Sequence, residues 1–354
     1  MTEARWQRQR GLSLVELMIA MLLGLIVLLA VSQIFVGNRQ TFALTEASSE
    51  VQESGRIALQ LLSRAVRNAD YWGCLEGPDA VDSILDVSDP DSPYQFDRGV
   101  TAVQNNTVGT DMRADSAVLS LVGINSSITA PLSDSQESGH LNGATGVDFT
   151  TLFQGGEILV ATNCEFADIF QVSSVQASEL TYSASSTMIP GNVRGNLNNA
   201  EGNYRNGRVQ PVTGERYFVR VLDDGRPALM YQRLNTRNSG GGDYLDANEL
   251  VAGVERMAIQ LGIDSNGNGE IDRWDDLRDS GDATAESHAD EALGLRVSLL
   301  VSSRTDQVTE TPVSYCFPAW GDCGESGSDR ETASDRRLYR VYSTSMGIRN
   351  RLPD

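Results

Sequence analysis

A continuous apolar stretch from Leu12 to Val36 constrains this chain more than any other feature of its sequence. As a helix with a rise of 1.5 Å per residue, this stretch would be about 37 Å long, which is enough to cross a bilayer with some tilt. No Ala-x-Ala pattern closes the stretch, whereas a secretory signal normally ends in a small-residue cleavage site. The stretch is therefore predicted to be a retained membrane anchor. Its few polar residues are Ser13, Glu16, Ser32 and Gln33.

The charges before the anchor predict its orientation. Residues Met1 to Arg10 contain three arginines, and only Glu3 opposes them. Because basic residues favour the cytoplasmic side of a membrane, the N-terminus is expected in the cytoplasm and the chain after Val36 outside it. The prediction is a single-pass protein of the inner membrane with a periplasmic domain.

Glu16 does not suit a plain anchor, because a charge inside hydrocarbon costs a few kcal/mol on insertion scales. One interpretation is that Glu16 lies near the membrane surface, where its carboxylate stays hydrated. The other is that the carboxylate pairs with a cation from a neighbouring chain. The residue type and its position leave both interpretations open.

The residues from Arg10 to Leu17, RGLSLVEL, resemble the prepilin cleavage motif of type IV pilins and type II secretion pseudopilins. The resemblance rests on a basic leader, Gly11, a Glu at the fifth position after the cut and a long apolar stretch. It implies that a prepilin peptidase cleaves between Gly11 and Leu12 and that Leu12 is then N-methylated. It also implies that Glu16 pairs with the new N-terminal amine of an adjacent subunit. The family usually has Phe where this chain has Leu12.

The helix is predicted to continue beyond the anchor, because residues 37–69 contain no Pro and carry an amphipathic stripe. Apolar residues recur at helical spacings and predict a face that packs against the globular domain. A helix over 12–69 would be about 87 Å long. The residues of the stripe are Val51, Ala58, Leu61, Leu62 and Ala65.

From residue 70 to 354 the sequence changes to short β-rich segments separated by Gly, Asn, Ser and Asp, which is typical of antiparallel sheet. Residues 78–106 and 191–206 are expected to form long loops. The predicted fold class is α+β and pilin-like, with one long N-terminal helix on an antiparallel β-sheet and large loop insertions. The predicted strands are 117–122, 157–161, 169–175, 215–222, 228–234, 254–263, 295–301 and 338–346.

Two later segments resemble PilW-like minor pilins, namely residues 255–302 and the ending at 337–352, RLYRVYSTSMGIRNRL. This resemblance implies a minor pilin that joins other minor and major pilins in a priming or tip complex of a type IV pilus. A type II secretion pseudopilin and a tip adhesin are the alternatives. At the C-terminus, Arg349 and Arg351 are expected either in a solvated end or in a basic contact at the tip.

Composition disfavours other classes of protein. The net charge of -20 argues against nucleic acid as a partner, because phosphate binding needs a basic face. All 28 basic residues are Arg, which excludes a catalytic Lys, and only two His are present. Motifs of catalytic nucleophiles, zinc proteases and dinucleotide sites are absent from the sequence. An assembly protein is therefore favoured over an enzyme.

The segment 264–275, DSNGNGEIDRWD, has the spacing of a calcium-binding EF-hand loop. Oxygen-bearing side chains occur at loop positions 1, 3, 5, 9 and 12, and Gly occupies position 6. Position 12 is Asp instead of Glu, and a strand pattern precedes the loop, so an Asx-rich turn without metal is the alternative. The predicted calcium ligands are Asp264, Asn266, Asn268, Glu270 (through its backbone carbonyl), Asp272 and Asp275.

The four cysteines are expected to form two disulfides, because the domain is predicted to lie outside the cytoplasm. Cys316 and Cys323 are close in sequence, and Pro318 and Gly321 between them can turn the chain, so a local bridge is expected. Such a bridge also resembles the C-terminal disulfide loop of pilins. Cys74 would then pair with Cys164 and join the helix end to the sheet.

Overall fold

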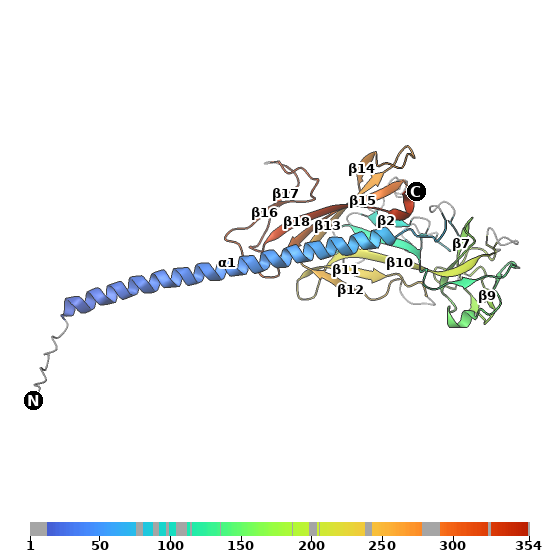
Figure 1. The fold of residues 1–354 in the computed structure, drawn as a ribbon, viewed down its shortest axis with the longest axis horizontal. Helices are drawn as coiled ribbons and strands as arrows, with labels where there is room; N and C mark the ends of the chain where they lie inside the picture. Colours follow the sequence, from blue (N-terminus) through green and yellow to red (C-terminus); the bar gives the residue numbers. More distant parts are fainter. Residues whose placement is uncertain are drawn as a thin grey trace, which may run out of the picture.

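One long N-terminal helix carries a β-rich domain on its C-terminal half in the computed structural model (Figure 1). This arrangement confirms the predicted α+β, pilin-like fold class. The described residues are 13–75, 81–87, 92–96, 99–103, 112–113, 115–134, 136–185, 187–197, 204, 206–237, 243–277, 291–324 and 327–352.

Helix α1 extends from Leu14 to Asn68, a length of about 82 Å for its 55 residues. The hydroxyl of Ser13 caps its first turn by accepting the backbone N–H of Glu16. At the other end the backbone becomes extended at Ala69, the C-cap, and Asp70 follows in a left-handed conformation with a φ of 56°. Only the C-terminal half of α1 is buried in the domain, through residues spaced three or four apart. These residues are Ala47, Val51, Gly55, Ala58, Leu62 and Val66.

A four-stranded antiparallel sheet, in the order β14-β13-β15-β18, packs against this buried face. Helix α1 contacts β15 and β18 in particular. Close approach is possible because residue 55 is Gly: a Cβ there would overlap the ring of Tyr342 on β18. The strands are β13 (Val254–Ile263), β14 (Arg273–Asp276), β15 (Ala292–Ser302) and β18 (Tyr339–Gly347).

A nine-stranded sheet forms the other main layer, and its longest strand, β10 (Arg208–Val221), joins its two parts. The first residues of β10 pair with β4 and β6, and the later ones pair with β3 and β11. The pairing is antiparallel except between β1 and β7, which run parallel. The other strands are β1 (Val81–Ser83), β2 (Val100–Val103), β3 (Val118–Ile124), β4 (Ala130–Pro131), β6 (Ile158–Thr162), β7 (Ala167–Gln171), β11 (Pro227–Arg233) and β12 (Asn248–Ala252).

The largest core lies between α1, the four-stranded sheet and β3, β10 and β11. A second core lies around β6, β7 and a three-stranded sheet, and it buries large aromatic side chains such as Phe149 and Phe170. Figure 1 shows β7 and β9 beyond the C-terminal end of α1. The remaining elements are β5 (His140–Asn142), β8 (Ser174–Val175), β9 (Glu179–Thr181), β16 (Ser314–Cys316), β17 (Arg330–Thr332) and the 3-10 helices η3 (Phe149–Thr151) and η5 (Arg349–Arg351).

Each predicted strand segment coincides with or overlaps an observed strand, and the segment 254–263 matches β13 at both ends. The prediction of a long loop over 78–106 was wrong, because β1 and β2 lie within it. Both are short strands: β1 pairs with β7, which is far from it in sequence, and β2 pairs with β3, the next strand in the chain. Such short segments carry little periodicity of their own, so their strand state depends on tertiary pairing.

Candidate functional site

The N-terminal half of α1 is an exposed apolar rod. The helix is long and apolar enough to cross a membrane, and none of its most apolar segment is buried. Every large hydrophobic side chain between Leu14 and Val36 is exposed. A continuous apolar surface of this kind requires lipid or other apolar helices around it. The predicted cleavage residues Gly11 and Leu12 lie outside the described residues.

Glu16 lies in the first turn of this rod. Its backbone N–H donates to the Ser13 hydroxyl at 3.2 Å, and the residue is exposed. An acidic side chain is favoured at a helix N-terminus, because the backbone N–H groups there carry partial positive charge. Among the described residues no Arg or His forms a salt bridge with Glu16. The geometry therefore allows the carboxylate to receive a cation from another chain.

A buried ion pair clamps the opposite end of α1 to the C-terminus. Asp70 follows the helix directly, and its carboxylate accepts hydrogen bonds from the Arg351 guanidinium and, at 2.7 Å, from Trp72 Nε1. The side chains of Arg351 and Asp70 are only 4% and 0% exposed. The amide of Asn350 donates to the carbonyl of Ala69 at 2.7 Å, so consecutive residues of η5 hold the helix end.

The clamp corrects the expectation for Arg351, which is neither solvated nor part of a basic surface. Its guanidinium also donates to the carbonyl of Ala292 at 3.1 Å and so links the helix end to β15. Arg349, in contrast, is exposed. Sequence reasoning missed the pair because Asp70 and Arg351 are 281 positions apart and neither belongs to a local motif.

A second charged cluster surrounds Glu255 on β13. Its carboxylate accepts from Arg113 at 2.7 Å and from Ser302 at 2.7 Å, and it pairs with Arg337 at 2.8 Å. Burial lowers the pKa of Arg337, but the Asp335 hydrogen bond and the Glu255 charge outweigh it and raise the pKa above its ordinary value. The cluster lines a cavity of about 260 Å³, and its acidic and basic side chains form ion pairs with one another. Its role is to join β13 to the segments before β3 and β18.

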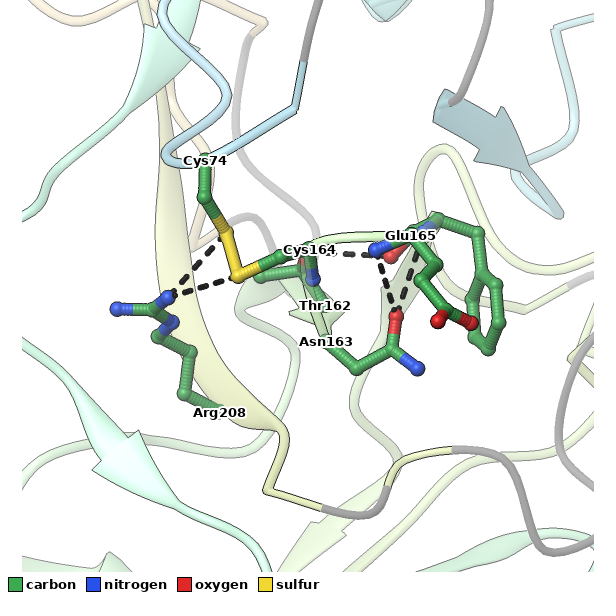
Figure 2. The surroundings of a disulfide bond; sticks show 7 residues. Cys74, Thr162, Asn163, Cys164, Glu165 and Arg208 are labelled. Carbon is green, nitrogen blue, oxygen red and sulfur yellow. Dashed lines mark hydrogen bonds between the residues drawn. A yellow bond between two sulfur atoms is a disulfide. The ribbon is translucent and has the colours of Figure 1, made fainter.

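Two disulfides are present, Cys74–Cys164 and Cys316–Cys323, with Cα–Cα distances of 5.0 and 5.5 Å. These are the pairs that the cysteine spacing predicts, and the described chain has no free cysteine. Cys74 comes six positions after the end of α1, and Cys164 lies in the turn between β6 and β7. Figure 2 shows this disulfide beside the guanidinium of Arg208.

Internal hydrogen bonds order the acidic loop at 264–275. The carboxylate of Asp264 accepts the backbone N–H groups of residues 266–269, the shortest two at 2.7 Å from Gly267 and Gly269. Desolvation raises the pKa of Asp264, but these hydrogen bonds outweigh it and hold the pKa below its ordinary value. Asp272 accepts from Ser265 and Asn266. The loop thus has the hydrogen bonding of an Asx-rich turn.

One of the predicted ligands of this loop lies outside the turn. Asp275 lies on β14 and pairs with Arg273 at 3.0 Å. Within the described ranges, no three His, Cys, Asp or Glu side chains are arranged so that they could share a metal ion. Calcium binding would therefore require Asp275 and Asp272 to exchange their present partners for the ion, and it stays a prediction.

Comparison with known families gives two matches, one in the β-rich domain and one at the N-terminal part of the chain. Residues 216–350 match the family model of the type IV pilus-assembly protein W, and residues 6–32 match the prokaryotic N-terminal methylation motif. The first match extends from within β10 into η5, and the second covers the exposed apolar rod with Glu16. No curated protein and no solved structure matches the chain. The two matches confirm the resemblance to PilW-like prepilins.

Proposed function

We propose that this chain, a PilW-like minor pilin of the type IV pilus, acts in the complex that primes pilus assembly and stays at the pilus tip. Residues before Gly11 lie in the cytoplasm, and the β-rich domain lies in the periplasm until assembly. Prepilin peptidase cleaves between Gly11 and Leu12 and methylates the new N-terminus. These steps fit the methylation motif and its apolar helix.

The observation that carries this proposal is the division of α1 into an exposed apolar half and a half buried in the domain. The apolar half first partitions into the membrane, where lipid covers it. During assembly the apolar helices of other pilins replace that lipid. Cleavage creates a positive amine that cannot remain alone among apolar helices, and Glu16 of a neighbouring subunit neutralises it. This pairing sets the register between subunits without any chemical turnover.

The position of the second core supports a place at the tip. The strands β7 and β9 extend the domain beyond the C-terminal end of α1, on the side away from the apolar rod (Figure 1). A subunit stacked above this chain along the helix direction would meet that bulk. A terminal position avoids the clash, whereas an internal position would need the second core to move aside.

The proposal is tested by deletion of the gene, with surface pili and protein secretion measured in the same strain. We expect surface pili to be lost or strongly reduced and secretion to be unaffected, with piliation restored by the intact gene. The opposite pattern, normal pili with a secretion defect, would assign the chain to a type II secretion pseudopilus. Normal pili and normal secretion would contradict an assembly role.

Calcium binding by the loop at 264–275 is a separate proposal, supported by the EF-hand-like spacing of its oxygen ligands. A ligand that binds only the folded state raises stability by mass action, so calcium should raise the melting temperature of the wild-type protein relative to chelator. Asp275→Asn should remove this rise but leave the melting temperature in chelator nearly unchanged. Asp264→Ala is not a clean test, because Asp264 orders the loop without metal. Equal melting in calcium and chelator would establish the plain turn.

A further inference from the structure

The disulfide between Cys74 and Cys164 is open to attack. Both cysteines are exposed, although they join the end of α1 to the sheet that covers the second core. Cys74 also lines a groove of about 1,030 Å³, together with Arg67 and Arg349. Exchange requires a thiolate to reach a sulfur atom, and exposed disulfides are the ones that exchange most readily. Access to this bond is therefore already present in the folded protein.

A cation faces both sulfur atoms. The Nη2 atom of Arg208 lies 3.3 Å from the sulfur of Cys74 and 3.3 Å from that of Cys164 (Figure 2). Arg208 begins β10, and its backbone is opposite Thr162 at the end of β6, which places its side chain beside the turn that contains Cys164. Figure 2 shows Glu165 directed away from the sulfurs. A positive charge at this position stabilises a cysteine thiolate and attracts an anionic attacking thiol.

The backbone at Cys164 adds a second reason for opening. Its φ of 76° is a left-handed conformation that non-glycine residues rarely adopt. The disulfide and the turn together hold this conformation, and within the turn Asn163 accepts the N–H groups of Glu165 and Phe166 at 3.0 and 3.3 Å. Loss of the disulfide would allow Cys164 to leave this unfavourable conformation.

We propose that Cys74–Cys164 is a thiol–disulfide exchange site for a dithiol reductant, with Arg208 as its positioning residue. One thiolate of the reductant attacks one cysteine sulfur and forms a mixed disulfide, and the electron pair of the broken bond moves to the other cysteine. That cysteine leaves as a thiolate beside Arg208. The second thiol of the reductant then displaces the first cysteine. The protein gains two electrons as a dithiol, and the reductant becomes a disulfide.

The second disulfide lacks this environment and serves as an internal reference. Cys323 follows Asp322, whose backbone N–H donates to the carboxylate of Asp329, and the backbone of Cys316 pairs with that of Arg330, so charges of both signs lie nearby. In the described part of the chain no guanidinium donates to the sulfurs of Cys316 or Cys323. Cys74–Cys164 lies outside the matched residues 216–350, whereas Cys316–Cys323 lies within them. Opening Cys74–Cys164 would free the helix end from the second core.

The experiment is mild reduction of the full-length protein in detergent with dithiothreitol at pH 7, followed by alkylation and peptide mapping over time. Cys74–Cys164 should be reduced before Cys316–Cys323. Arg208→Gln should slow its reduction about three- to tenfold, because the departing thiolate loses its cation. Arg208→Lys should retain most of the wild-type rate, since the charge is kept. Arg233→Gln, which removes an exposed cation from β11 of the same sheet, should not change the rate.

The result that would overturn the proposal is an Arg208→Gln rate within twofold of the wild type, or earlier reduction of Cys316–Cys323. Each variant is first shown to contain both disulfides by non-reducing peptide mapping. A variant that misfolds would show incorrect disulfide pairs in this mapping. In that case the role of the cation is tested by measuring the reduction rate of Cys74–Cys164 in Arg208→Lys and in the wild type at increasing salt concentration. Salt should slow the reduction of both proteins, because it screens the attraction between the cation at position 208 and the anionic thiol. No slowing by salt would equally contradict the role of Arg208.

Discussion

Asp70→Asn should lower the free energy of unfolding of the domain by about 3–5 kcal/mol, the cost of removing one partner from a buried ion pair. Asn keeps the shape of the side chain and tolerates the left-handed backbone at this position, so the change isolates the charge. Arg351 would be left buried without its counter-charge, next to the helix end that it normally holds. Urea unfolding of a soluble domain beginning near Thr41, with both disulfides intact, measures the effect.

The matched control is Asp224→Asn, which removes one partner of an exposed pair with Arg226 at 2.6 Å. Because water screens exposed pairs, this change should leave the unfolding midpoint almost unchanged. Combining Asp70→Asn with Arg351→Met should destabilise the domain less than the sum of the single changes, since neither charge then remains alone. Equal midpoints for Asp70→Asn and the wild type would show that the clamp does not stabilise the domain.

Glu16→Ala should still be inserted and cleaved, because it makes the anchor more apolar, but its incorporation into pili should fall sharply. An unpaired amine among apolar helices costs a few kcal/mol, which corresponds to a loss of about tenfold to a hundredfold. Immunoblots of sheared pili and of the membrane fraction measure how much of the protein is incorporated into pili relative to the amount in the membrane. The structure places Glu16 on an exposed helical turn with its carboxylate available to a neighbour.

Gln33→Ala is the matched control for Glu16→Ala, because it also removes a polar side chain from the apolar stretch but carries no charge. It should be incorporated like the wild type. Normal incorporation of Glu16→Ala would mean that the carboxylate is merely hydrated at the membrane surface. In that case the register between subunits would have to come from the apolar contacts alone.

Periodicity predicted the helix and the main strands because those elements bury repeating apolar faces. Val51, Ala58 and Leu62 of the predicted stripe pack on the sheet as expected and are fully buried, whereas Leu61 is exposed. The methylation motif was found for a different reason, since its chemistry requires a fixed local order of residues. Cysteine spacing was sufficient for the disulfides because one pair is local and only one other pair then remains.

Contacts between distant segments were not predictable in this way. The clamp between Asp70 and Arg351, the cluster around Glu255 and the contact of Gly55 with Tyr342 each join residues far apart in the chain. No local pattern distinguishes Arg351 from exposed Arg349 two positions before it. Arg208 became a candidate functional residue only when the fold placed it against the sulfurs of Cys74 and Cys164.

The identity of the mature N-terminus tests the central claim most directly, because every step of the proposed assembly depends on cleavage of the prepilin. The measurement is the intact mass and N-terminal peptide of the protein recovered from membranes and from sheared pili. The account predicts an N-methylated Leu12 as the first residue in both fractions, and retention of the leader when Gly11 is replaced by a bulky residue. A chain that begins at Met1, or at any residue after Val36, would contradict it.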